Sequence, residues 1–211
     1  MGGSLQTFTL RAHLKTPVIR RGFVTLDALL MAVLERGDVS HLLRCEDGLY
    51  FASAGFPVDT SAAHRASFVA SMRPEHSAHW LELIESNTRD GDLRIGLSRQ
   101  REAGNIINAY SATVAQAVEW YGTGHSDEVL AALKEVRFIG KKRSAGYGEV
   151  IRWEVEPGDL DGVVGFASEP LRPLPTERWT HGGDWVPVEA AWKAPYWDVR
   201  NRTRCFVPEI T

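Results

Sequence analysis

The sequence is poor in cysteine and has no long apolar run. Its two cysteines, Cys45 and Cys205, stand far apart in a chain of 211 residues. They form neither a disulfide framework nor a zinc-binding pattern, so we interpret them as inert thiols and expect a cytoplasmic protein. The strongly apolar stretch 28–34 is far shorter than the roughly 20 residues that span a bilayer. The first residues lack a basic segment followed by an apolar one, so we expect neither a signal peptide nor a membrane partner.

The chain also lacks an excess of positive charge. Its net charge is −3, which by itself does not indicate a nucleic-acid-binding protein. Phosphates, however, respond to the local field within ~10 Å rather than to the total. The basic residues gather in three clusters: Arg11, Lys15, Arg20 and Arg21; Arg137, Lys141, Lys142, Arg143 and Arg152; and Arg200, Arg202 and Arg204. Each cluster is open to two readings, a phosphate-binding patch or a solvated face.

Several catalytic and cofactor motifs are missing. The sequence has no Gly-x-Ser-x-Gly elbow, and its glycines and lysines do not follow the order of a Walker or dinucleotide-binding loop. His76 and His79 have a spacing that suits a metal on a helix, but no further ligand cluster supports them. We therefore expect no cofactor and no metal.

Periodicity predicts a strand and then a helix at the start of the chain. Apolar and polar residues alternate over 6–15, which is typical of a half-buried strand. Thr25 is a suitable N-cap, Asp27 falls in the first helical turn, and Gly37 is a natural stop. A short strand is predicted over 49–56.

The rest of the chain is predicted less evenly. Residues 107–119 fit either a strand or a helix, whereas Ser126 is expected to cap a second helix and 149–156 to form a strand. We interpret 57–108 as an insertion that carries a hairpin or short helices. From 163 to 211 the chain is an extension with four tryptophans expected to pack on the main domain: Trp179, Trp185, Trp192 and Trp197.

The expected fold is α+β. Strand, helix, strands, helix and strand over 1–162 suit a ferredoxin-like (RRM-like) βαββαβ domain, in which a sheet carries two helices on one side. Such sheets are common platforms for RNA.

A basic, glycine-punctuated loop precedes the last predicted strand. It contains Gly140, Lys141, Lys142, Arg143, Ser144, Gly146, Tyr147 and Gly148. The glycines permit positive φ, and exposed amides in such a turn form an anion-binding concavity. The cations and the hydroxyl suit phosphate, and the tyrosine ring offers a face for a base. The sequence therefore predicts an RNA-binding loop, with a plain basic surface turn as the alternative.

The segment 139–150 is similar to the C-terminal glycine-rich loop of the RAMP superfamily of CRISPR proteins. The segments 14–18 and 25–30 resemble the Cas-five-like subunit of type IV CRISPR complexes, the Csf-three family. Weaker similarity to that family lies in 50–53, 172–175 and 194–197.

This resemblance implies a non-catalytic subunit that binds and caps the 5′ handle of the guide RNA. Its partners would be the backbone (Cas-seven-like) and large subunits, and indirectly the target nucleic acid. The expected RNA-binding residues are those of the loop together with Lys15, Arg20 and Arg21.

Two alternatives remain at this point. Some RAMP relatives cut repeat RNA without a metal, and here His13, assisted by Lys142 and Tyr147, would be the candidate. The other alternative is an assembly module whose loop binds protein. Binding through phosphates weakens steeply with salt, whereas an apolar protein contact does not, which separates the RNA and protein readings.

Overall fold

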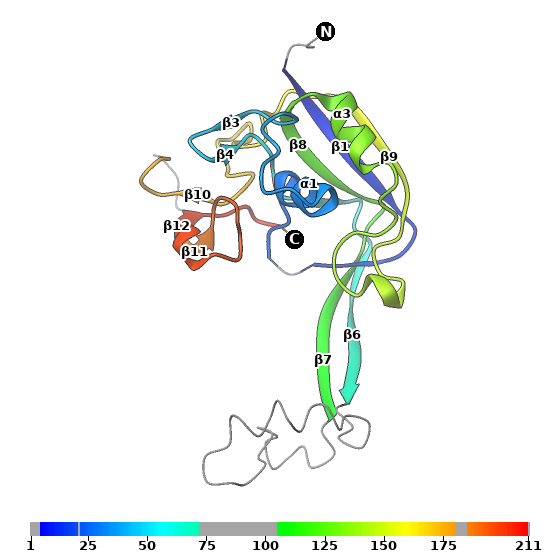
Figure 1. Ribbon diagram of the computed structural model, residues 1–211. Coiled ribbons are helices and arrows are strands. Elements are labelled where there is room, and N and C mark those ends of the chain that lie inside the picture. The colour runs from blue at the N-terminus through cyan, green and yellow to red at the C-terminus, as the bar shows by residue number, and fades with distance from the viewer. Residues whose placement is uncertain (1–4, 21, 72–104, 180–184, 211) are drawn as a thin grey trace, which may run out of the picture. The chain divides into compact units, whose positions relative to one another are not determined.

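The computed structural model describes residues 5–20, 22–71, 105–179 and 185–210 (Figure 1). The chain divides into two compact units, one made of Met1–His64 with Ala112–Thr211 and the other of Arg65–Ser111. It is a mixed α/β protein whose strands are mostly antiparallel, and its described residues contain two α-helices. The expected mixture of helices and strands is confirmed.

The core of the first unit is built on a four-stranded antiparallel sheet. Its order is β5–β8–β1–β9, formed by Phe56–Val58, Ala117–Gly124, Gln6–Leu14 and Val150–Pro157. The predicted first strand is confirmed, because its alternate residues Phe8, Leu10, Ala12 and Leu14 are buried. The strand predicted over 149–156 is confirmed as β9.

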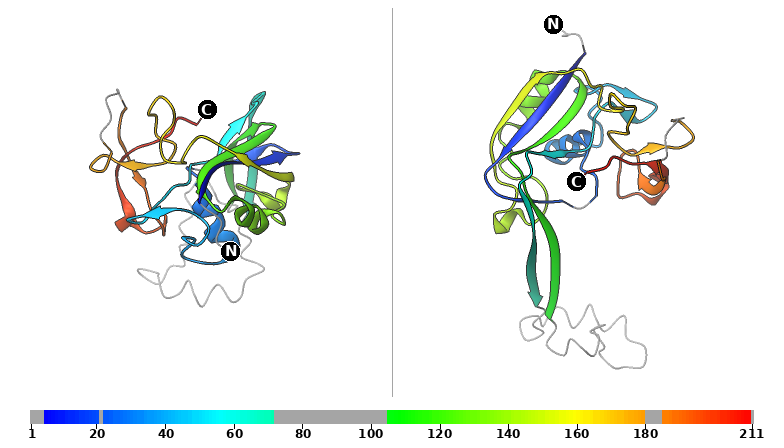
Figure 2. Two further views of the ribbon diagram at one scale, coloured as in Figure 1. Left: turned by 90° about the horizontal axis from the view of Figure 1, so that it is seen from above. Right: turned by 180° about the vertical axis from the view of Figure 1, so that it is seen from behind.

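Two helices cover one face of this sheet. They are α1 (Leu26–Leu34) and α3 (Ser126–Leu133). Leu30 of α1 and Leu133 of α3 are fully buried in one cluster with Trp120 of the sheet, whose ring stacks on Trp153 at a centroid distance of 5.9 Å. The opposite face of the sheet is turned to the viewer in the right-hand view of Figure 2.

The helix ends agree with the predicted ones in part. Thr25 occupies the N-cap position of α1 and Asp27 lies in the first turn, as predicted, but the Thr25 hydroxyl makes no capping bond and donates instead to the Tyr196 hydroxyl oxygen at 3.2 Å. The helix ends before Gly37, because Glu35 adopts a left-handed conformation with φ 53°. Ser126 does not cap α3; it lies within the first turn, and His125 occupies the N-cap position.

A second sheet has the order β2–β7–β6, formed by Val18–Ile19, Asn105–Val114 and Ala62–Ser71. Residues 107–119, for which the sequence allowed either a strand or a helix, belong to two strands, because β7 and β8 follow each other after a short turn. Neighbouring β6 and β7 agree with the hairpin expected in the insertion. Most of the insertion, including His76 and His79, lies outside the described residues.

The single strand expected over 49–56 is not formed; short pieces of extended chain take its place. β4 (Leu49–Tyr50) pairs with β3 (Cys45–Glu46) in a small hairpin, and single bridges at Ala52 and Ala54 precede β5.

The C-terminal segment forms its own small sheet. Its order is β10–β12–β11, from Leu174–Pro175, Arg202–Phe206 and Val188–Ala191, with the 3₁₀ turn Val199–Asn201 before β12. Trp192 is buried in it, and Trp179 lies edge-on to Phe206. The prediction that Trp197 packs is wrong, because it is 84% exposed.

A buried arginine joins this segment to α1. Arg172 is fully buried, and its guanidinium donates to the carbonyl oxygens of Tyr50, Ala52 and Trp192 and to the hydroxyl of Tyr196. Its Nη1 also lies 3.4 Å from the buried carboxylate of Asp27, which accepts a hydrogen bond from Tyr196. Burial lowers the pKa of Arg172, but Asp27 and Tyr196 raise it by more, so the group stays charged.

Candidate nucleic-acid interface

The loop between α3 and β9 has an unusual backbone. Gly140, Gly146 and Gly148 have φ of 77°, 84° and 71°, and Lys142 also lies in the left-handed region at 59°. A short 3₁₀ turn, Arg143–Ala145, stands between these positions. Such conformations favour glycine, which accounts for the glycine spacing that marked the loop in the sequence.

Close backbone contacts hold the loop onto the chain around β2. The Gly148 amide donates to the Pro17 carbonyl at 2.9 Å, and the Lys141 amide donates to the Ile19 carbonyl at 2.8 Å. A Cβ on Gly140 would fall 2.5 Å from the oxygen of Ile19, and one on Gly148 would fall 2.0 Å from a carbonyl oxygen. A Cβ on Gly146 would meet nothing within 4 Å. Two of the glycines are therefore needed for close approach, and the third only for its φ.

Most backbone amides of the loop, which were expected to bind phosphate, already donate hydrogen bonds to carbonyl groups of the protein. Besides those of Lys141 and Gly148, the amides of Ala145 and Gly146 donate to loop carbonyls at 2.9 Å. The loop consequently has little of the expected amide concavity, and its capacity to bind an anion lies mainly in its side chains.

The side chains of the loop differ in their exposure to solvent. Lys141, Arg143 and Ser144 are exposed, whereas Lys142 and Tyr147 are half-buried. Within the described part of the chain, Lys141 and Arg143 form no ion pair. Their charge is therefore available to an external anion.

Two of the three more distant predicted cations, Lys15 and Arg20, lie in the part of the chain that the structure describes, and Lys15 lies next to the end of the loop. Lys15 is bonded through its amide to the carbonyl of Glu149, directly after the loop, and its Nζ lies 3.0 Å from the Glu149 carboxylate. Arg20 is partly buried, which lowers its pKa, and Nη1 donates to the Gly55 carbonyl at 3.4 Å. Arg21 lies outside the described residues.

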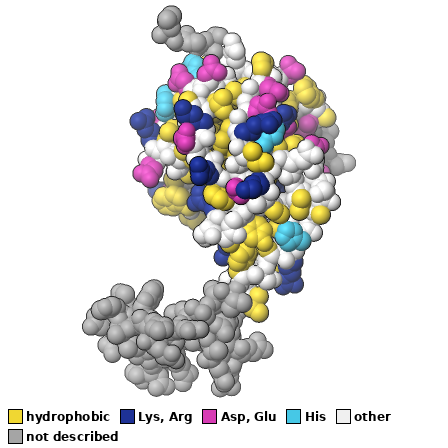
Figure 3. Space-filling model, turned by 90° about the vertical axis from the view of Figure 1, so that its right-hand side faces the viewer, with side chains coloured by type: hydrophobic (Ala, Val, Ile, Leu, Met, Phe, Trp, Pro, Cys, Tyr) yellow, Lys and Arg dark blue, Asp and Glu magenta, His cyan; other side chains and the backbone are white. Residues whose placement is uncertain are grey.

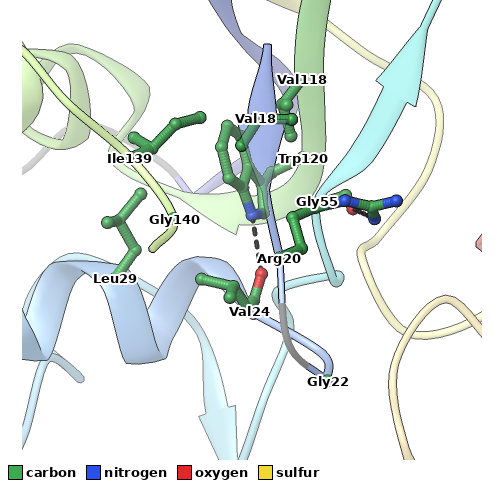
Figure 4. Close-up of a pocket in the computed structure, with 10 residues that line it drawn as sticks. All are labelled: Val18, Arg20, Gly22, Val24, Leu29, Gly55, Val118, Trp120, Ile139 and Gly140. Atoms are coloured by element: carbon green, nitrogen blue, oxygen red, sulfur yellow. Dashed lines mark hydrogen bonds between the residues drawn. The ribbon is translucent and has the colours of Figure 1, made fainter. Parts of the chain in front are cut away.

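The side chain of Arg20 borders a small apolar pocket next to the start of the loop (Figure 4). Its guanidinium is directed toward Gly55 and away from the ring of Trp120. Apolar side chains form most of the lining: Val18, Val24, Leu29, Val118, Trp120 and Ile139. Arg20 is thus part of the packing around β2, and its Nε is buried without a partner within the described residues.

On the open face of the central sheet, cations are paired with carboxylates. Arg11 lies 2.6 Å from Glu119, His13 Nε2 lies 2.6 Å from Glu154, and Arg152 lies 3.3 Å from the same Glu154 oxygen. His13 and then Arg152 lower the pKa of Glu154. Basic, acidic and histidine side chains are likewise interspersed over the upper part of the face in Figure 3. These cations are largely neutralised by their neighbours.

Sequence reasoning missed one neighbour of the loop. The ring of His64, from β6, lies against the ring of Tyr147 with centroids 6.4 Å apart and planes inclined by 38°. His64 is exposed and stands in a polar stretch of sequence far from the loop, so no local pattern singled it out.

Other kinds of site find little support in the described residues. No group of three or more histidine, cysteine, aspartate or glutamate side chains among them could hold a metal ion. None of their helices combines the length and apolar character needed to cross a membrane.

The family described as CRISPR type IV associated protein Csf3 matches residues 85–208, more than half of the chain. A search of curated proteins finds no match.

Proposed function

Because the chain belongs to the CRISPR type IV associated protein Csf3 family, we propose that it is a non-catalytic, RNA-binding subunit of a type IV CRISPR ribonucleoprotein. In this proposal it binds and caps the 5′ handle of the guide RNA. Its protein partners are the backbone (Cas-seven-like) and large subunits, and it meets the target nucleic acid only indirectly.

The strand order supports a ferredoxin-like domain of the RAMP type. The elements that form and cover the central sheet follow each other along the chain as β1, α1, β5, β8, α3, β9, and the sheet order is β5–β8–β1–β9. This subset agrees with a βαββαβ order in which the second and fourth strands lie at the edges, and the glycine loop lies between α3 and β9.

The observation that carries the proposal is the contrast between the loop and the sheet. On the sheet, Arg11 and Arg152 are engaged by carboxylates, whereas Lys141 and Arg143 project from an anchored backbone with no ion pair among the described residues. A pre-positioned cation loses less entropy when it meets a phosphate, and an unpaired one gives up no existing partner. The loop is therefore the favoured place for an RNA backbone.

The test is RNA binding across a salt series. The variant carries Lys141→Ala, Lys142→Ala and Arg143→Ala, and the RNAs are a CRISPR repeat and a scrambled strand. Each lost phosphate contact lowers the slope of log K against log salt by about 0.7 for single strands, so three contacts lower it by about 2. If the three charges contribute nothing at 1 M salt, the variant binds about 100-fold more weakly at 0.1 M.

A matched control removes three charges elsewhere. The variant with Arg200→Ala, Arg202→Ala and Arg204→Ala has the same net charge, but these residues lie in the C-terminal sheet and the turn before it. It should keep the wild-type slope. Equal binding by the loop variant and the wild type would show that the loop does not hold RNA.

We also propose that the chain does not cut RNA. The candidate base His13 shares Nε2 with Glu154 at 2.6 Å and Arg152 at 3.1 Å, so that nitrogen is engaged by protein groups. Purified protein incubated with repeat RNA and EDTA should leave the RNA intact. Cleavage that disappears with His13→Ala would contradict this.

A further inference from the structure

The loop has an aromatic neighbour that its sequence did not indicate. Tyr147 and His64 place their rings 6.4 Å apart, centroid to centroid. Tyr147 is half-buried, whereas His64 is exposed on the strand that begins the insertion. The pair therefore offers ring surface to solvent from two segments far apart in sequence.

The pair stands close to the loop cations. The Tyr147 amide reaches the carbonyl of Lys142 at 3.4 Å, and the next amide is bonded to Pro17 at 2.9 Å. The ring of Tyr147 is thus attached to a fixed piece of backbone that begins at the basic residues. Proteins usually bind single-stranded RNA with cations that follow the phosphate backbone and with exposed aromatic rings beside them. The rings contribute because every base has a face that can stack.

The exposure of His64 also matters. Its side chain is exposed, so a base can approach its ring from solvent, whereas Tyr147 is half-buried beside it with the ring planes inclined by 38°.

We propose that His64 and Tyr147 together form a stacking site for one unpaired base of the RNA. The phosphates next to that base are held by the loop cations. This inference rests on the proposed RNA-binding function and adds a base-contacting residue outside the glycine-rich loop.

The test compares full-length variants by fluorescence anisotropy with a labelled single-stranded CRISPR repeat RNA. His64→Ala should weaken binding about tenfold, since one stacked base contributes about 1–3 kcal/mol. His64→Phe keeps a ring and should bind within about twofold of the wild type. Tyr147→Leu keeps an apolar side chain but loses the ring, and it should weaken binding as His64→Ala does. The matched control is His41→Ala, an exposed histidine between α1 and β3.

The salt dependence separates stacking from charge. Loss of a stacked base leaves the slope of log K against log salt unchanged, whereas loss of a phosphate contact lowers it by about 0.7. A lowered slope for His64→Ala, or failure of His64→Phe to restore binding, would overturn the stacking site. Circular dichroism and thermal unfolding confirm that each variant is folded.

The outcomes also separate this inference from the proposed function. If wild type binds, the loop variant does not, and His64→Ala binds like wild type, the base site is wrong and the RNA-binding loop stands. If wild type and the loop variant bind equally, or neither binds, the proposed function fails and the base site fails with it.

Discussion

Replacing Asp27 by asparagine tests the contact between α1 and the C-terminal segment. The carboxylate of Asp27 and the guanidinium of Arg172 both have 0% exposed side chains and lie 3.4 Å apart. The substitution Asp27→Asn keeps the shape of the side chain, but it leaves the guanidinium buried without its counter-charge. Breaking a buried pair in this way costs about 3–5 kcal/mol, a large share of the roughly 5–15 kcal/mol that stabilise a typical protein.

The assay is equilibrium unfolding in urea, followed by tryptophan fluorescence and circular dichroism. Glu46→Gln is the matched control, because its pair with Arg44 is exposed on both sides and should contribute about 0–1 kcal/mol. The double variant Asp27→Asn, Arg172→Met removes the unpaired charge, so it should lose less than the sum of its single variants. A loss below about 0.5 kcal/mol for Asp27→Asn would refute the reasoning.

Three further predictions concern the loop, a thiol and the sheet. Gly148→Ala should lower the melting temperature well below that of Gly146→Ala, because its Cβ would fall 2.0 Å from a carbonyl oxygen while the other meets open space; equal melting temperatures would contradict this. Burial raises the pKa of Cys205 to about 11, so the thiol should react with a disulfide reagent at pH 8 only after unfolding. His13→Ala should raise the pKa of Glu154, measured by carboxyl NMR titration, since His13 is the largest contributor to its lowering. The stability from that carboxylate is present above its unfolded pKa of about 4.3 and is lost as the pH falls through the folded value, and the variant should show a weaker dependence, because Arg152 still lowers the pKa of Glu154.

The strand β1 and the helix α1 were predictable because each has its own periodicity in the sequence. Alternation over 6–15 gave β1, and helical spacing after Thr25 gave α1. The ends were less predictable, because tertiary contacts override local signals. Thr25 turns its hydroxyl to Tyr196, a residue 171 positions away, and this partner is invisible to any local pattern.

The segments that resembled the Csf3 family find a common explanation in packing. Residues 25–30, 172–175 and 194–197 share no local motif, yet they contribute Asp27, Arg172 and Tyr196 to one buried cluster. These three similarities therefore coincide with residues that stabilise the packing around α1.

The candidate site was predictable only in part. The glycines of the loop require positive φ or close approach, and these requirements are visible in the sequence. Arg20, by contrast, belongs by sequence to a basic cluster, but its side chain turns toward Gly55 and is partly buried. His64 reaches Tyr147 only because β6 lies beside β7, a pairing across the insertion that no periodicity reveals.

The number of cations is therefore a poor guide to where a chain offers positive charge to an anion. Arg11 and Arg152 carry the same charge as Arg143, but each of them faces a carboxylate within 3.3 Å. A phosphate approaching the sheet would have to compete with those carboxylates and would be repelled by them, whereas Lys141 and Arg143 of the loop face no carboxylate among the described ion pairs. Strand alternation places unlike charges opposite each other on β1, β8 and β9. The loop lacks that pairing because its backbone leaves the sheet, and this is the physical reason why a chain with net charge −3 can still present exposed cations without a carboxylate partner among the described ion pairs.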